Sequence, residues 1–123
     1  MKNGTITESI SYGNIFASGL NSAQYVGGIA GYIDGTISYS MSYTVIKGLN
    51  YLGGISGYAT KTSKIISNLS DCYFVVETGS TYIGNILGYA DSLDMSSGTF
   101  NENIKYNYYI DNEFKGINKI NYG

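Results

Sequence analysis

Carboxylates and tyrosines are the side chains of this chain with the widest chemical scope, since its 123 residues include nine Asp and Glu and 14 Tyr. Paired carboxylates can act as general acid and base, and aromatic rings beside carboxylates can bind sugars or cations. Histidine is absent, which excludes histidine-bearing metal motifs and histidine-assisted nucleophiles. The single cysteine, Cys72, has no base near it in the sequence, so we interpret it as a small residue in a strand. We expect no catalytic residue, no metal site and no cofactor.

One position of a recurring phrase is acidic or aromatic in every copy. The phrase reads GTITESISY, GTISYSMSY and GTFNENIKY, and a weaker copy, LSDCYFV, precedes the last of these. Its fifth position holds Glu8, Tyr39, Asp71 and Glu102, which are our candidate ligand-binding residues. If the copies stack in register, about 4.8 Å apart, these side chains form a strip that could bind a sugar or a cation. A column of solvated acids, or a tyrosine hydroxyl bonded to a neighbouring carboxylate, explains the same pattern.

Three other aspartates occur where turns are expected. Asp34 lies in IDGT, and Asp91 and Asp94 lie in ADSLD, which are polar contexts that favour Asp for turn geometry. The DSLD segment offers oxygen ligands for calcium, but it lacks the dense spacing of a calcium-binding loop. We therefore assign no metal ligand to these residues.

A second phrase alternates with the first and must help to position it. YVGGIAGY, YLGGISGY and YIGNILGY begin at Tyr25, Tyr51 and Tyr82, and each ends in a further tyrosine. Aromatic residues that recur in frame favour a stack within the fold, so we expect Tyr25, Tyr51 and Tyr82 to lie along one axis. The glycines between them permit bends and close backbone approach.

Both phrases alternate with a period of two residues, which is typical of half-buried strands. In GTISYSMSY this alternation predicts one face that carries Ile37, Tyr39, Met41 and Tyr43, with the serines on the other. Helical periodicity is not sustained anywhere, so we expect little or no helix.

The repeat length predicts the architecture. A unit of about 25–30 residues with two or three extended pieces favours an all-β fold, a β-solenoid of the parallel β-helix type with about four coils. Propeller blades need about 40–45 residues, and a β-sandwich remains open because alternation alone does not specify topology. We expect a single repeat domain over residues 1–123, a fragment of a larger protein. Its predicted units are a partial one at 1–24, then 25–50, 51–81 and 82–105, with a C-terminal cap at 106–123.

Charge and hydropathy exclude some partners. The net charge is −2 and the seven basic residues form no run, so we expect no nucleic-acid partner. Continuous apolar stretches stay far below the roughly 18 residues of a membrane span, and we expect no membrane insertion. The first residues lack the apolar segment of a signal peptide.

Residues 25–43, YVGGIAGYIDGTISYSMSY, resemble the GLUG-motif repeat of bacterial surface and secreted proteins. The copies at 51–58 and 82–89 match the same glycine phrase, with an insertion around KTSKII after the former and Asn85 replacing a glycine in the latter. The resemblance implies repeats that are found in adhesin-like proteins and beside the catalytic domains of immunoglobulin-cleaving metallopeptidases. Such repeats are considered non-catalytic, so no functional residue is carried over.

The expected function is therefore a structural spacer or an adhesion-type interaction module of a bacterial cell-surface or secreted protein. Its partners would be a glycan or protein of a host or matrix, together with adjacent domains of the same chain. The alternative is a carbohydrate-binding module that uses tyrosine and acidic side chains. An enzyme that acts through paired acids is a third, less favoured hypothesis.

Overall fold

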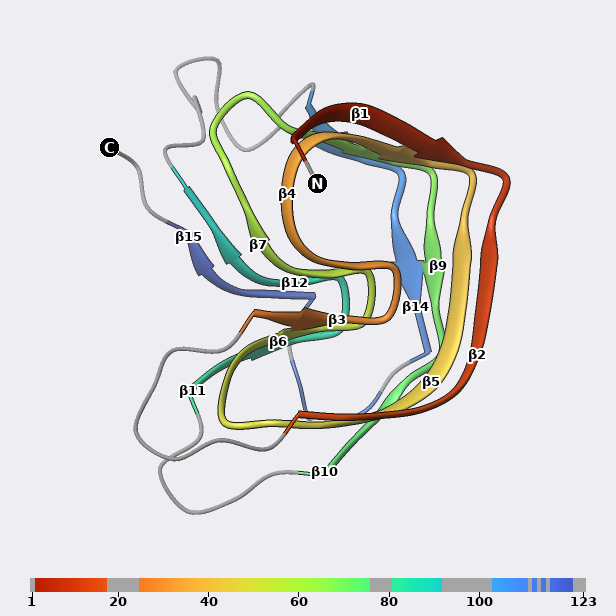
Figure 1. Ribbon diagram of the computed structural model, residues 1–123, viewed down its shortest axis with the longest axis vertical. Coiled ribbons are helices and arrows are strands. Elements are labelled where there is room, and N and C mark those ends of the chain that lie inside the picture. The colour runs from red at the N-terminus through yellow and green to blue at the C-terminus, as the bar shows by residue number, and fades with distance from the viewer. Residues whose placement is uncertain are drawn as a thin grey trace.

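The computed structural model describes residues 2–17, 25–75, 81–91, 103–110, 112, 114 and 116–120 (Figure 1). These residues form strands joined by turns and contain no helix, so no membrane-spanning helix occurs among them. The strands are β1 (Lys2–Thr7), β2 (Ile10–Phe16), β3 (Val26–Gly27), β4 (Ala30–Ser38), β5 (Met41–Lys47), β6 (Asn50–Gly53), β7 (Ser56–Ala59), β8 (Lys64–Ile66), β9 (Leu69–Ser70), β10 (Tyr73–Val75), β11 (Thr81–Gly84), β12 (Leu87–Ala90), β13 (Ile104–Lys105), β14 (Tyr108–Tyr109) and β15 (Ile117–Ile120).

Parallel pairing joins each copy of the repeat to the next. The seven-stranded sheet runs β13-β8-β4-β7-β12-β15, with β1 also on β4, and the five-stranded sheet runs β10-β5-β9-β14, with β2 on β5. The third sheet is β11-β6-β3. Tyr32 pairs with Tyr58, which pairs with Tyr89, so the glycine phrases lie in register. The prediction of an all-β fold is confirmed for the described residues, and its sheets are parallel.

The repeated tyrosines form two stacked columns. Tyr25, Tyr51 and Tyr82 follow one another with ring centroids 4.9 Å apart at each step, as predicted. The second column is formed by the tyrosines that end the phrase, with centroid distances of 5.2 and 5.1 Å and nearly parallel rings. Its members are Tyr32, Tyr58 and Tyr89. Rings of the two columns meet edge to face, an arrangement that aromatic quadrupoles favour.

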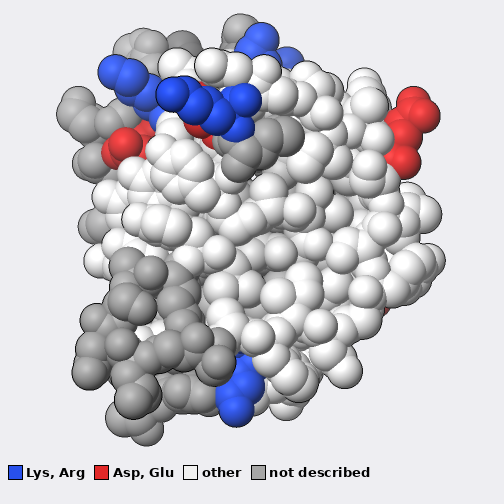
Figure 2. Space-filling view, in the orientation of Figure 1, with Lys and Arg blue, Asp and Glu red and all other residues white. Residues whose placement is uncertain are grey.

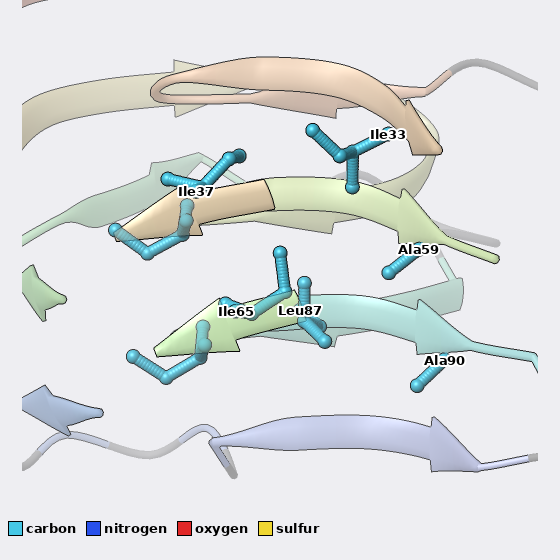
Figure 3. Close-up of a cluster of buried hydrophobic side chains, with 8 residues drawn as sticks. Ile33, Ile37, Ala59, Ile65, Leu87 and Ala90 are labelled. Atoms are coloured by element: carbon cyan, nitrogen blue, oxygen red, sulfur yellow. The ribbon is translucent and has the colours of Figure 1, made fainter. Parts of the chain in front are cut away.

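The core is built from columns of apolar residues that are contributed by neighbouring repeats (Figure 3). In one column Ile33 pairs with Ala59, and Ala59 pairs with Ala90. On the adjoining part of the sheet, Ile37 pairs with Ile65. A second cluster, which includes Ile46, Leu52 and Phe74, fills the other part of the interior. Burial of these side chains, at about 25 cal/mol per Å² of apolar surface, is what holds the repeats together.

The prediction of a single face for Ile37, Tyr39, Met41 and Tyr43 is wrong. Ile37 is fully buried, but Tyr39 is 64% exposed and Met41 is 39% exposed, while Ser40 and Ser42 are buried. Tyr39 has a φ of 50°, and this left-handed residue turns the chain at a corner between β4 and β5. The period of two restarts beyond the corner with the opposite phase, because the left-handed residue breaks the pleat.

Small polar side chains therefore point inward from β5 and β9. The second glycine of the pair in each of the first two glycine phrases, Gly28 or Gly54, packs on them. A Cβ atom at Gly28 would collide with the hydroxyl of Ser42, and one at Gly54 would collide with the hydroxyl of Ser70. The bend within each of the first two glycine phrases thus lies close to the inner side of the five-stranded sheet. Glycine is required there for close approach.

A column of polar side chains fixes the corners that follow β1, β4, β8 and β13. The backbone amide of Ser9 donates to Ser40 Oγ at 3.2 Å, and that of Ser40 donates to Asn68 Oδ1 at 3.0 Å. The amide of Asn68 in turn donates to Asn107 Oδ1 at 3.0 Å. We call these four residues the corner ladder. They satisfy backbone groups that the turns leave without a sheet partner.

Candidate functional site

The structure brings two of the four candidate residues into one column and separates the third. Glu8 and Tyr39 both begin a corner, with amides that donate to the carbonyls of Ser38 and Ile66. The next residue of this column is Ser67, because its amide donates to Lys105 O at 3.1 Å. Glu102 lies outside the described residues.

Asp71 occupies a different column. Its amide donates to Ser42 O at 2.9 Å, which places it beside Tyr43 on β5. The KTSKII segment causes the difference, because its Ile65 pairs with Ile37 and is part of the repeat rather than an insertion. The corner column is thus Glu8, Tyr39, Ser67 and Tyr106, which share left-handed φ values of 51°, 50°, 59° and 58°.

Side chains that leave the five-stranded sheet outward form an extended aromatic and apolar surface, which we call the outer face. In Figure 1 its strands β2, β5, β9 and β14 lie side by side below the corner. Its exposed large side chains are Ile10, Tyr12, Phe16, Tyr39, Met41, Tyr73, Tyr106, Tyr108 and Ile110. Contiguous exposed apolar surface of this kind marks interaction sites. In the view of Figure 2 the outer face lies along the right-hand edge, and the charged side chains that this view shows lie towards the margin of the molecule.

One hollow on this side of the molecule contains Asp71, and we call it the Asp71 groove. It has a volume of about 440 Å³, and Tyr43, Tyr73, Ile110 and Phe114 contribute to its walls. The ring of Tyr43 also stacks on Tyr12, with centroids 5.3 Å apart. An exposed carboxylate beside tyrosine rings can accept hydrogen bonds from ligand hydroxyls.

Cys72 lies at the base of the Asp71 groove and is nearly buried. Its Sγ is 3.3 Å from both Ser42 Oγ and Thr44 Oγ1, so its polar neighbours are hydroxyl groups. Neither hydroxyl is a base that could activate a thiol at neutral pH. The prediction that Cys72 lies in a strand is wrong, because the residue falls between β9 and β10, where it lies beside Thr44.

A second hollow surrounds Ser67, and we call it the Tyr39 groove. Its volume is about 340 Å³. It is lined by Tyr39, Ser40, Met41, Ser67, Asn68, Leu69, Tyr106 and Tyr108. Sequence reasoning missed Ser67 and Tyr106 because the column was assigned through Asp71. The sequence carries no clear signal for them, because the residues that follow the corner in these repeats, Ser40 and Asn68, differ in type.

The acids of the described residues do not gather into a metal-binding group. Within this part of the chain no cluster of three or more His, Cys, Asp or Glu side chains could hold a metal ion. Asp34 instead accepts hydrogen bonds from Thr62 Oγ1 at 2.7 Å and Thr60 Oγ1 at 3.0 Å. These bonds lower the pKa of its carboxyl group and tie the turn after β7 to β4. The prediction of a turn at Asp34 itself is wrong, because the residue lies within β4 and its carboxylate holds the turn of the next repeat instead.

The tyrosine columns predict an alkaline limit to stability. Burial, followed by a hydrogen bond to Asp91, raises the pKa of Tyr58 far above the ordinary value of 10.0. Above pH 10 the unfolded chain therefore releases a proton that the folded chain retains, so the free energy of unfolding falls as the pH rises. We expect the melting temperature of the wild type to fall more steeply between about pH 9 and 11.5 than that of Tyr58→Phe. Equal slopes for the two proteins would contradict this assignment.

The outer face and its two grooves are the surface of the described structure best suited to binding, and the grooves contain tyrosine, serine and the carboxylate of Asp71. No family model, curated protein or solved structure matches the chain.

Proposed function

We propose that the chain is a β-solenoid of the parallel β-helix type, with about four coils, and that it serves as a non-catalytic structural and adhesion-type interaction module. Parallel pairing between successive copies of the repeat supports the solenoid, because each copy then covers the apolar edge of the next. The two tyrosine columns, each in contact at every step, support it as well.

The exposed outer face is the observation that carries the adhesion role. Tyrosine and phenylalanine supply large contact areas at low conformational cost, and they are enriched where proteins meet partners. A surface with few charges suits a neutral partner, such as a host or matrix glycan or protein. The likeness of residues 25–43 to the GLUG repeat supports a place at the bacterial cell surface or in a secreted protein, beside other domains of the same chain.

Carbohydrate binding through tyrosine and acidic side chains is the second candidate function. The Asp71 groove favours it, because a carboxylate and two tyrosines, Tyr43 and Tyr73, contribute to one hollow. Stacking of a sugar on a ring, together with hydrogen bonds from its hydroxyls to a carboxylate, is the chemistry such a hollow offers.

A triple substitution on the outer face tests the adhesion role. We expect the intact chain to adhere to cells, matrix proteins or a glycan array, and we expect Tyr12→Ser/Phe16→Ser/Tyr73→Ser to reduce that adhesion at least about tenfold. The three side chains are exposed, so their loss should leave the melting temperature nearly unchanged.

The matched control is Lys61→Ser/Lys64→Ser, which alters exposed side chains beside β8 and should retain full adhesion. The proposal would be refuted if the wild-type chain showed no binding to cells, matrix proteins or glycans. Hydrolysis of a polysaccharide by the chain itself, lost on Asp71→Asn, would also refute it.

A further inference from the structure

A tyrosine is missing from the corner column at Ser67. The column continues from Tyr39 to Ser67 to Tyr106, and all three residues have left-handed φ values. Tyrosine is therefore compatible with the backbone of this column on either side of Ser67. The serine leaves a space between two exposed rings, and the Tyr39 groove is this space.

The floor of the groove belongs to the adjacent outward column. Met41 pairs with Leu69, and Leu69 pairs with Tyr108, so an apolar strip runs beneath the two corner rings. Ser40 and Asn68 also border the groove, but they take part in the corner ladder. Rigid neighbours on both sides hold the groove open without a ligand, which lowers the entropic cost of binding.

The width of the space selects the thickness of its occupant. Adjacent tyrosines in the other columns stand 4.9 to 5.3 Å apart. Two steps of this kind place Tyr39 and Tyr106 about 10 Å apart, in line with the spacing of neighbouring strands. A flat ring between two aromatic faces needs about 7–8 Å, because carbon atoms make contact at about 3.5–4.0 Å on each side. A puckered pyranose ring, with hydrogens projecting from both faces, is thicker and fills the larger space.

The chemistry of the lining selects a neutral ligand. The described side chains that line the groove are tyrosine, serine, methionine, leucine and asparagine, and none carries a charge at neutral pH. Lys105 does not line the groove, but its Nζ lies over the Tyr106 ring, 5.5 Å from the ring centroid. The hydroxyls of Ser67 and Tyr108 can donate to and accept from sugar hydroxyls, while the ring faces contact the apolar C–H groups of the sugar.

We propose that the Tyr39 groove binds one neutral pyranose residue of a polysaccharide between the rings of Tyr39 and Tyr106. The inference rests on the proposed adhesion function and names its ligand class, and it assigns the binding to a site separate from the Asp71 groove. The missing tyrosine at Ser67 is the specific feature that makes the site.

The test is a titration of the full chain with each of three tetrasaccharides: cellotetraose, maltotetraose and chitotetraose. Binding is measured by amide NMR and by calorimetry. At least one of these should bind and shift the amide signals of Ser67, Leu69 and Tyr106. Tyr39→Ala and Tyr106→Ala should each weaken binding about tenfold. Ser67→Tyr should abolish binding at an unchanged melting temperature, since it fills the space with the residue that the column accepts elsewhere. Lys61→Ser/Lys64→Ser, which alters exposed side chains outside both grooves, should bind like the wild type.

Three outcomes would overturn the inference. One is the absence of shifts with every tetrasaccharide at about 10 mM, a concentration that saturates even a millimolar site. Another is binding that survives Ser67→Tyr. The third is a hexaproline peptide that binds the groove when the saccharides do not, because aromatic grooves also accept proline-rich helices. The adhesion role is tested at Tyr12, Phe16 and Tyr73, which do not line this groove, so the two proposals can fail separately.

Discussion

Gly54→Ala is expected to lower the melting temperature by about 12 °C. The added Cβ would collide with Ser70 Oγ and with the backbone carbonyl of Asn85. A side chain can rotate away from such a contact, but a carbonyl held in the bend cannot, so neighbouring repeats must separate. Overpacking of this kind costs about 3 kcal/mol, and for a domain of this size that corresponds to about 4 °C per kcal/mol. Thermal and urea unfolding followed by circular dichroism measure the effect.

Gly13→Ala is the matched control. Nothing lies within 4 Å of a Cβ at Gly13, but its φ of 108° is unfavourable for alanine. Its cost is therefore conformational alone, about 1 kcal/mol. Equal losses for the two variants would contradict the close-packing explanation for Gly54.

A second variant separates the two contacts at Gly54. Ser70 Oγ is buried without a hydrogen-bond partner among the described residues, so Ser70→Ala alone should be neutral or slightly stabilising. Combined with Gly54→Ala it should recover part of the lost stability, because one of the two collisions is removed.

The parallel stacking of the repeats was predictable because both phrases recur in a constant order. Identical spacing of Tyr, Gly and apolar residues favours one register, in which like residues lie beside one another. The contact between the rings of Tyr25 and Tyr51 agrees with this expectation. In-frame recurrence is a global property of the sequence. It does not depend on any single residue, and it survives local errors of alignment.

The direction of the side chains beyond the corner was not predictable from alternation. The left-handed position is held by Glu8, Tyr39, Ser67 and Tyr106, which share no chemical type and include no glycine. Without such a signal, a strict period of two continues through the corner and assigns every later residue to the wrong side. The candidate site suffered from the same cause, because the unmarked corner at Ser67 allowed Asp71 to be placed in its column.

The corner ladder was also not predictable from the sequence, since Ser40 and Asn68 accept equivalent hydrogen bonds with different side chains. Each accepts a hydrogen bond from the backbone amide of the preceding repeat, and only the geometry shows that they correspond. Polar side chains inside a repeat protein are therefore poor guides to register before the backbone is known, although they are essential to its stability.

Removal of the Asn68 side chain is the second large effect that we expect. Asn68 is 1% exposed, its Oδ1 accepts from the amide of Ser40, and its Nδ2 donates to Ile37 O at 2.9 Å and to Asn107 Oδ1 at 3.0 Å. Asn68→Ala leaves a buried amide and a buried carbonyl without these partners. Each such group costs about 1–3 kcal/mol, so we expect a loss of about 3 kcal/mol in urea unfolding.

Asn68→Ser distinguishes hydrogen bonding from lost volume. Serine at the same place in the ladder, Ser40, accepts from the amide of Ser9 through its hydroxyl, so a serine at position 68 can do the same for Ser40. It should recover about 1 kcal/mol relative to alanine, although it adds only one oxygen atom. Asn107→Ala should cost less than Asn68→Ala, because Asn107 is half-buried and water can reach the groups it leaves. If all three variants lose the same stability, the ladder stabilises the corners by packing rather than by satisfying buried backbone groups.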